Sequence, residues 1–383
     1  MKIVKLAKRL GCCVLLVTPG LLLESQLIQA QPHPISAAEA VNSWQTLDTE
    51  AYKGKRDDIS FGTPTHGWYG TGKGDLFATE DGGENWKLVS SRPGTFIRAL
   101  GFIDEKTGFI GNVGTDYYPG VTDETPLYRT DDGGMNWTPV DLGNNTIKGV
   151  CAIDILPVRN FYQGELRDET IIHAAGRVGG PTGILRSLDG GHSWTVIDMQ
   201  DHAGMILDIK FFDAWTGLVF ASSSTGDDRQ GLILRTTDGG KSWKQVYRSG
   251  RDAELIWKAS FVDSKTGYAT VQSYDAGRAQ QLIVKTSDGG KSWSELPLTS
   301  DTGARQFGIG FVDENHGWVG TMAGGFYTSD GGKSFTPAPI ARAANKFRII
   351  RGEKDISVFA IGTEVQRLKL EASGQRNKRN GRE

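Results

Sequence analysis

The sequence contains few cysteines and few histidines, and neither sign of charge dominates. Three cysteines among 383 residues (Cys12, Cys13 and Cys151) cannot build a disulfide framework, which excludes a disulfide-stapled scaffold. The six histidines are scattered without metal-ligand spacing, so we expect neither a metal site nor a cofactor. Lys and Arg number 43 against 45 Asp and Glu, and this balance argues against nucleic-acid binding through a broad basic surface.

Long apolar runs are also rare, and the longest lies at the N-terminus. Basic residues precede it up to Arg9, and a polar stretch follows it, with Ile28 and Ala30 at the −3 and −1 positions of a cleavage site. This order is typical of a secretory signal, and the run is short for a membrane span. We therefore predict a signal peptide over residues 1–30 and an exported protein. An uncleaved anchor is the alternative.

Glycine and aromatic residues are abundant instead. The chain has 51 Gly, about twice the average share, together with 16 Phe, 10 Trp and 10 Tyr. Its other apolar segments are only a few residues long. This combination indicates many short strands joined by tight turns.

One short motif recurs six times and organises the chain. The copies read EDGGENW (80–86), DDGGMNW (131–137), LDGGHSW (188–194), TDGGKSW (237–243), SDGGKSW (287–293) and SDGGKSF (329–335). Successive copies are 42 to 57 residues apart, which suits one four-stranded blade of a β-propeller per copy. The leading acid and closing ring of each copy are Asp81 and Trp86, Asp132 and Trp137, Asp189 and Trp194, Asp238 and Trp243, Asp288 and Trp293, and Asp330 and Phe335.

These motif residues are predicted to be structural. An Asp side chain can accept a hydrogen bond from the backbone two residues on, and the Gly pair can adopt the positive φ of a tight turn. The ring that follows can pack back over the hairpin and between blades. We therefore assign no catalytic role to the six Asp residues.

A seventh blade can be assembled from the two ends of the chain. Three further strands are predicted at 347–351, 356–362 and 365–370, without a DGG motif or a fourth strand. The segment 42–47 (NSWQTL) resembles the outer strands of other blades. It would complete the last blade and remove the free sheet edges. Six blades with loose ends are the alternative.

The domain boundaries follow from this assignment. The chain is predicted to be an all-β, seven-bladed propeller over residues 41–370, with its last blade closed by an N-terminal strand. A linker is predicted over 31–40, and a disordered polar tail over 371–383.

The repeats resemble a known family. The DGG-x-x-W turns are similar to Asp-box (BNR) repeats, which also occur in sialidases, other glycosidases and sorting receptors. The longer unit, such as FVDSKTGY (261–268) followed by LIVKT (282–286) and SDGGKSW (287–293), resembles the photosystem II stability/assembly factor family, from about Trp44 to Leu370.

This resemblance implies a non-enzymatic propeller in a periplasm or a thylakoid-lumen-type compartment, associated with the membrane. Its implied partner is a protein, such as a membrane-protein assembly intermediate, and no nucleic acid. We expect a monomer.

Long loops are predicted to crowd the face opposite the boxes, where a rigid scaffold would present binding residues. The loops are 114–126, 157–169, 176–183, 222–231 and 272–281. Tyr, Trp and Arg are enriched in binding hot spots. The predicted partner-binding residues on these loops and on the blade-to-blade turns are Arg98, Tyr117, Tyr118, Lys148, Arg177, Arg229, Trp257, Arg278, Arg305 and Arg348, with Tyr274 beside them. We expect Arg98→Glu with Arg305→Glu to abolish partner binding and to leave the melting curve nearly unchanged.

A carbohydrate-binding or glycoside-hydrolase (sialidase-like) propeller is the alternative. Arg98, Arg305 and Arg348 could converge near the channel as a sialidase arginine cluster, but the Arg-Ile-Pro motif expected near the start of sialidases is missing. Other glycosidases need paired carboxylates, and nothing in the sequence fixes the separation of any pair. The candidate carboxylates are Asp116, Asp208 and Glu254. We therefore predict a binding protein without catalytic residues, for which a glycan stays open as a ligand.

Overall fold

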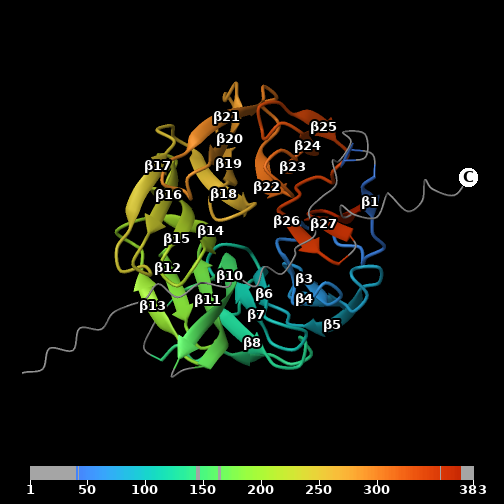
Figure 1. The fold of residues 1–383 in the computed structure, drawn as a ribbon, viewed down its shortest axis with the longest axis vertical. Helices are drawn as coiled ribbons and strands as arrows, with labels where there is room; N and C mark the ends of the chain where they lie inside the picture. The colour runs from blue at the N-terminus through green and yellow to red at the C-terminus, as the bar shows by residue number, and fades with distance from the viewer. Residues whose placement is uncertain (1–39, 42, 144–146, 163–164, 354, 372–383) are drawn as a thin grey trace, which may run out of the picture.

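The computed structural model describes residues 40–41, 43–143, 147–162, 165–353 and 355–371. In this part of the chain, 28 strands form seven four-stranded antiparallel sheets that are arranged as the blades of a ring (Figure 1). The all-β, seven-bladed propeller is thereby confirmed. The predicted signal peptide, nearly all of the linker and residues 372–383 lie outside the described residues. Among the described residues, no helix is both long enough and apolar enough to cross a bilayer.

Within each blade the strands follow one another from the channel outward. The first three blades are β2–β5 (Ile59–Phe61, Gly67–Gly70, Asp75–Thr79, Lys87–Ser91), β6–β9 (Ile97–Phe102, Gly108–Asn112, Leu127–Thr130, Thr138–Pro139) and β10–β13 (Ala152–Tyr162, Glu165–Gly176, Gly183–Ser187, Thr195–Asp198). The next three are β14–β17 (Met205–Phe211, Gly217–Ser222, Gly231–Thr236, Lys244–Arg248), β18–β21 (Glu254–Phe261, Gly267–Ser273, Gln281–Thr286, Ser294–Thr299) and β22–β25 (Gln306–Phe311, Gly317–Thr321, Gly325–Thr328, Thr336–Ala338). The last blade is β26–β28 (Lys346–Arg351, Asp355–Ile361, Val365–Glu371) with β1 (Gln45–Thr46).

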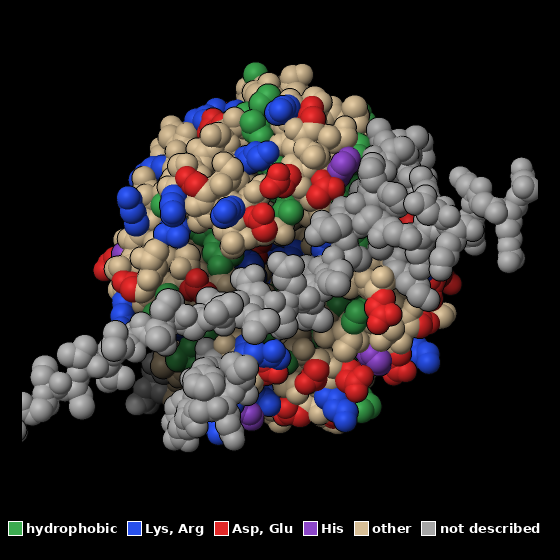
Figure 2. Space-filling view, viewed as in Figure 1, with side chains coloured by type: hydrophobic (Ala, Val, Ile, Leu, Met, Phe, Trp, Pro, Cys, Tyr) green, Lys and Arg blue, Asp and Glu red, His purple; other side chains and the backbone are tan. Residues whose placement is uncertain are grey.

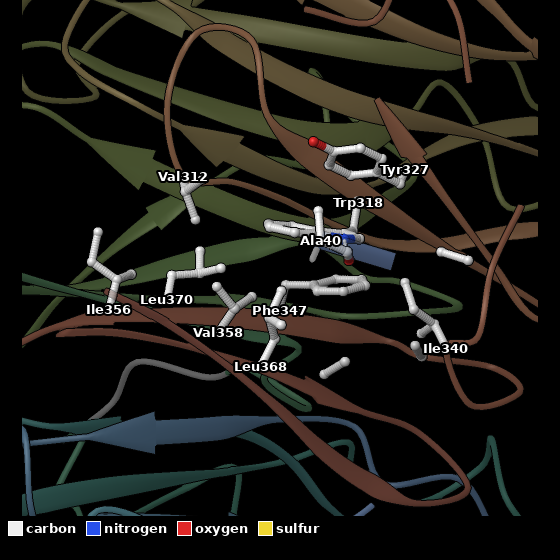
Figure 3. Close-up of a cluster of buried hydrophobic side chains, with 13 residues drawn as sticks. Ala40, Val312, Trp318, Tyr327, Ile340, Phe347, Ile356, Val358, Leu368 and Leu370 are labelled. Atoms are coloured by element: carbon white, nitrogen blue, oxygen red, sulfur yellow. Dashed lines mark hydrogen bonds between the residues drawn. The ribbon is translucent and has the colours of Figure 1, made fainter. Parts of the chain in front are cut away.

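The N-terminal strand closes the ring, as predicted. β1 pairs antiparallel with β28, with Gln45 opposite Arg367. The ring of Trp44 meets Trp318 of the sixth blade edge to face, at 5.7 Å between centroids. Ala40, which the sequence places at the end of the linker, is buried in the same cluster beside Trp318 (Figure 3). The chain ends therefore cover what would otherwise be an open sheet edge.

The turn between the first two strands of a blade explains the F-x-D-x-x-x-G part of the repeat. In the fifth blade, Asp263 Oδ1 accepts hydrogen bonds from the backbone of Lys265 and Thr266, at 2.7 and 2.6 Å. A Cβ on Gly267 would lie 2.3 Å from the ring of Phe261. Glycine is required because the Phe261 ring packs against the backbone at this point.

The Asp-box turns are built as hydrogen-bonded loops. In the fifth box, Asp288 Oδ1 accepts from the backbone N–H of Lys291 at 2.9 Å and of Ser292 at 3.0 Å. The Asp288 carboxylate thus accepts from the residues three and four positions further along the chain, whereas the sequence predicted the residue two positions further. The loop is longer because both glycines have positive φ. Trp293 then packs edge to face on Phe220 of the preceding blade, at 6.0 Å. The predicted packing of this ring between blades is confirmed.

Each box is also hydrogen-bonded to the blade before it. The carbonyl of the first box glycine accepts a hydrogen bond from a side chain of the preceding blade in all six copies. The donor and acceptor pairs are Arg367 and Gly82, Trp68 and Gly133, Arg129 and Gly190, Arg186 and Gly239, Arg235 and Gly289, and Lys285 and Gly331. The seventh blade lacks a box, and there Trp318 Nε1 donates to the carbonyl of Ala40 at 3.1 Å. The N-terminal segment therefore replaces the missing box as well as the missing strand.

One predicted loop lies on the other face. Residues 157–169 belong to β10 and β11, which pair continuously from Ala152 opposite Ala175 to Tyr162 opposite Glu165. The box of this blade lies beside the hairpin, because Gly190 donates its N–H to the carbonyl of Thr170 in β11 at 3.0 Å. First-to-second strand turns and box turns share one end of a blade. The prediction that this segment crowds the opposite face was therefore wrong.

We expect the stability of the propeller to fall at acid pH, because the Asp residues of the boxes become protonated. Burial acts to raise the pKa of Asp288, but hydrogen bonds from the hydroxyl and backbone of Ser292 outweigh it and lower the pKa to about 2. A carboxyl whose pKa in the folded state lies below its unfolded value of about 3.9 stabilises the protein above that value, and this stability is lost as the pH falls through the folded-state pKa. We expect the melting temperature to change little down to about pH 5 and to fall between about pH 4 and pH 2.

The variant Asp288→Ala isolates one box in this measurement. It should lower the free energy of unfolding by about 1 kcal/mol at neutral pH, because backbone donors of the loop lose their acceptor. The difference from wild type should shrink as the pH approaches about 2. A difference that is the same at both ends of the pH range would contradict the role of the ionised carboxylate.

Candidate functional site

A layer of side chains closes the channel at the end opposite the boxes. Each blade contributes one member of this layer, from its innermost strand or from the one or two residues before that strand: Asp57, Arg98, Cys151, Leu207, Trp257, Phe307 and Asn345. Trp257 Nε1 donates to Asn345 Oδ1 at 2.7 Å, and Asn345 Nδ2 donates to the carbonyl of Asp57 at 2.8 Å. Arg98 Nη1 donates to Asp57 Oδ1 at 2.6 Å. We call these seven residues the plug layer.

Arg98 is buried in the plug layer and is not an exposed residue of the binding face. Its side chain is 1% exposed, and its guanidinium lies 5.0 Å from the centre of the Trp257 ring, across the channel. A glutamate at this position would stand against Asp57 and leave that carboxylate without its buried partner. For the double variant Arg98→Glu with Arg305→Glu, the structure therefore favours a loss of stability over the nearly unchanged melting curve expected from the sequence.

A charged layer lies below the plug layer in the channel. Lys258 Nζ and Lys346 Nζ approach Asp208 Oδ1 at 3.9 and 3.7 Å. Burial lowers the pKa of Lys258 to about 8, against the opposing effect of Asp208. Burial acts to raise the pKa of Asp208, but the two lysines outweigh it and the pKa is lowered. Asp208 is thus an ion-pair partner of the lysines and stays ionised.

Aromatic and arginine side chains surround the mouth above the plug layer. Tyr117 and Tyr274 are 43% and 44% exposed. Tyr118 stacks on Phe96 at 4.6 Å. Two arginines lie against the Tyr274 ring, Arg229 at 4.7 Å and Arg305 at 4.8 Å. We call Tyr117, Tyr118, Arg229, Tyr274 and Arg305 the mouth cluster.

The structure brings together part of the predicted binding set. The mouth cluster holds Tyr117, Tyr118, Arg229 and Arg305, and Lys148 is exposed on a neighbouring blade-to-blade turn. Arg278 also borders the mouth, paired with Glu254 at 3.3 Å. Partner binding by these residues stays a prediction.

The other members of the set are placed differently. Trp257 is a buried member of the plug layer, like Arg98. Arg177 is buried too, because it donates to the carbonyls of Thr115 and Gly180 and so ties two loops together. Arg348 lies deeper in the channel, where its Nε donates to the carbonyl of Ile59 at 2.9 Å.

The candidate catalytic carboxylates are engaged in other ways. Glu254 is 1% exposed and receives Arg251 Nε at 2.9 Å as well as Arg278. Asp208 is held by two lysines, and Asp116 is exposed on a loop. A general acid in a glycosidase needs a raised pKa, which surrounding basic groups oppose.

The proposed arginine trio is also divided. Asp57 holds Arg98, and Asp58 lies 3.4 Å from Arg348 Nη2, so two of the three arginines already have a carboxylate of the chain. Within the described residues, no group of three or more His, Cys, Asp and Glu could hold a metal ion.

Sequence reasoning missed the segment that crosses from β1 to β2. Tyr52 accepts a hydrogen bond from Gly72 at the mouth, and Arg56 is buried between the first and last blades. Lys55 pairs with Asp57 and lies over the Trp257 ring, at 5.9 Å. The only sequence signal was the acidic pair at 57–58, directly before the strand that the structure shows as β2. Beside this segment an open cavity of about 590 Å³ reaches from Lys73 to Tyr118.

The surface charge is mixed rather than segregated. On the face drawn in Figure 2, Lys and Arg side chains alternate with Asp and Glu over the blades. This agrees with the net charge of −2 and gives no broad basic surface on that face.

Comparison with known proteins links part of the chain to one family. The family model described as photosynthesis system II assembly factor YCF48 matches residues 191–304, which is less than a third of the chain. The matched residues run from the third box to the loop before β22. No curated protein sequence matches the chain.

Solved structures share the fold at low sequence identity. YCF48 bound to a D1 peptide superposes with a TM-score of 0.60 at 17% identity, over 92% of this chain and 100% of the other. YCF48 from Cyanidioschyzon merolae gives 0.56 at 17% identity, over 85% and 98%. The GH74 enzyme of Niastella koreensis gives 0.54 at 16% identity, over 82% of this chain and 52% of the enzyme. The resemblance predicted from the repeats is therefore confirmed: the chain is a seven-bladed propeller similar to photosystem II assembly factor YCF48.

Proposed function

We propose that this protein is an exported, non-enzymatic propeller that binds a protein partner at the mouth cluster and assists the assembly or stability of a membrane protein complex. The observation that carries the proposal is the mouth cluster itself. It places three tyrosines and two arginines on a rigid rim, and these residue types dominate binding hot spots. The similar structure of YCF48 with a D1 peptide supports a protein ligand. The signal predicted over residues 1–30 supports export to a periplasm or a lumen-type compartment.

A carbohydrate ligand is the second candidate. A GH74 enzyme shares the fold, and exposed tyrosines at a channel mouth can stack on sugar rings. The ion pairs of Glu254 and Asp208 weigh against hydrolysis, since neither carboxylate is free to act as an acid.

A pull-down tests the proposal. The chain from Gln31 is immobilised and exposed to detergent-solubilised membranes of the source organism, beside Arg229→Glu with Arg305→Glu. The control, Lys241→Glu with Lys291→Glu, makes the same charge change at exposed box positions on the opposite face. We expect a membrane protein to be retained by wild type and control and lost from the mouth variant.

Two other outcomes of the pull-down would contradict the proposal. Equal retention by all three proteins would move the binding site off the mouth. An empty pull-down, followed by a positive glycan array or hydrolase screen, would replace the assembly role with the carbohydrate one.

A further inference from the structure

Arg98 leaves one edge of its guanidinium without a partner. Its Nη1 donates to Asp57, whereas Nε and Nη2 are both buried and meet no acceptor within the described part of the chain. A buried donor of a charged group that stays unpaired has lost its hydration without gaining a hydrogen bond in return. Such an edge therefore calls for an acceptor that the described residues do not supply.

The same edge is filled by carboxylates elsewhere in this protein. Arg159 donates from Nε and Nη2 to the two oxygens of Asp168, at 2.6 and 3.1 Å. Arg129 donates from Nε and Nη2 to Asp131, at 3.0 and 2.8 Å. These two nitrogens form a planar fork whose spacing matches two oxygens of one carboxylate or phosphate.

The surroundings of Arg98 carry more positive than negative charge. Asp57 is shared by Arg98 and Lys55. The pKa of Lys55 lies well below its usual value, first because of burial and then because of Arg98, Lys258 and Arg305. Lys258 has Asp208 as its partner, so Asp57 alone serves Arg98 and Lys55, and a second negative charge would relieve their repulsion with Arg305.

Two walls of this site are aromatic. The Trp257 ring lies 5.0 Å from the Arg98 guanidinium, and Lys55 lies 5.7 Å from the centre of the Phe307 ring. Charge interactions are stronger in such surroundings than in open solvent.

We propose that the plug layer binds a small oxyanion, a carboxylate or a phosphate, on the Nε and Nη2 edge of Arg98, with Arg305 adding positive charge and Lys55 close by as a further donor. Arg305 belongs to the mouth cluster as well, but the fork of Arg98 lies below that cluster, and the anion site does not depend on the identity of any protein partner.

Thermal melts and calorimetric titrations of the chain from Gln31 test the site. Sodium formate, sodium phosphate and sodium chloride are compared at equal ionic strength. We expect a saturable rise in melting temperature with formate or phosphate at millimolar concentration, and a smaller rise with chloride. The relative strength of formate and phosphate tells a planar carboxylate site from a tetrahedral one. A linear rise without saturation is the general effect of salt and would overturn the proposal.

Two variants locate the anion. Arg98→Lys keeps the charge beside Asp57 and removes the fork, so the affinity should fall at least ten-fold. Arg129→Lys removes a fork that the chain itself fills with Asp131, so the affinity should stay within two-fold of wild type. An equal loss in both variants, or none in Arg98→Lys, counts against Arg98.

Competition in the wild-type protein gives an answer even if Arg98→Lys fails to fold. Saturating formate should weaken the apparent affinity for phosphate at least ten-fold, because both anions need the same fork. Independent binding of the two anions would overturn the single site.

Discussion

Arg98→Glu should lower the free energy of unfolding by about 3–5 kcal/mol, because it breaks a buried ion pair and sets two carboxylates against each other. Asp57 and Arg98 are both almost fully buried and 2.6 Å apart. The Trp257 ring would also lose the cation that lies 5.0 Å from its centre. Urea-induced unfolding, followed by tryptophan fluorescence, measures the change.

Two controls separate the ion pair from general damage. Arg98→Lys should lose much less stability, because it retains a cation beside Asp57. Arg305→Glu should cost about 1 kcal/mol or less, because this arginine lies at the partly exposed mouth and contributes mainly stacking on Tyr274. If Arg98→Glu and Arg305→Glu melted alike, the plug layer would not be the stabilising element inferred here.

A chain that begins at Asp48 should lose about 4 kcal/mol or more of unfolding free energy. The truncation removes β1, the Ala40 carbonyl that receives Trp318 Nε1, and the Trp44 ring that packs on Trp318. Loss of one packed tryptophan alone costs about 3–5 kcal/mol. The truncation also exposes the edge of β28, which invites pairing with a second chain.

Urea melts and size-exclusion chromatography test this closure. A chain that begins at Glu39 is the matched control, since it keeps Ala40, Trp44 and β1 and should melt like the full chain. The chain from Asp48 should unfold at lower urea and elute partly as larger species. Identical melts and elution for both chains would show that the ring does not need its N-terminal strand.

Much of the fold could be predicted because its signals are local. The DGG turn, the Asp-x-x-x-Gly turn and the apolar strands between them each lie within a few residues, and their repetition predicted six of the seven blades. The closing strand was also predictable, since residues 42–47 repeat the pattern of outer strands. The placement of 157–169 failed because a long hairpin and a long loop share the same composition.

The candidate site was harder to predict, since it depends on strands of different blades. Sequence reasoning chose Arg98 and Trp257 as surface groups by residue type. Their burial follows from the diameter of the channel, which brings the second and fifth blades within 5.0 Å of each other at these side chains. The roles of Lys55 and Asp57 could not be predicted, because Arg98, which pairs with Asp57, is 41 residues away and Trp257, which lies under Lys55, belongs to the fifth blade.

The sequence by itself determined the repeat, the number of blades and the way in which the ring closes, because turn chemistry and strand periodicity act over a few neighbouring residues. Only the tertiary structure decided which charged side chains are exposed at the mouth and which are buried below it. Arg305 and Tyr274 remain at the surface, whereas Arg98 is enclosed by Asp57 and Trp257. That division arises from the convergence of seven strands on one axis, where a side chain meets partners from blades that the sequence does not place next to it.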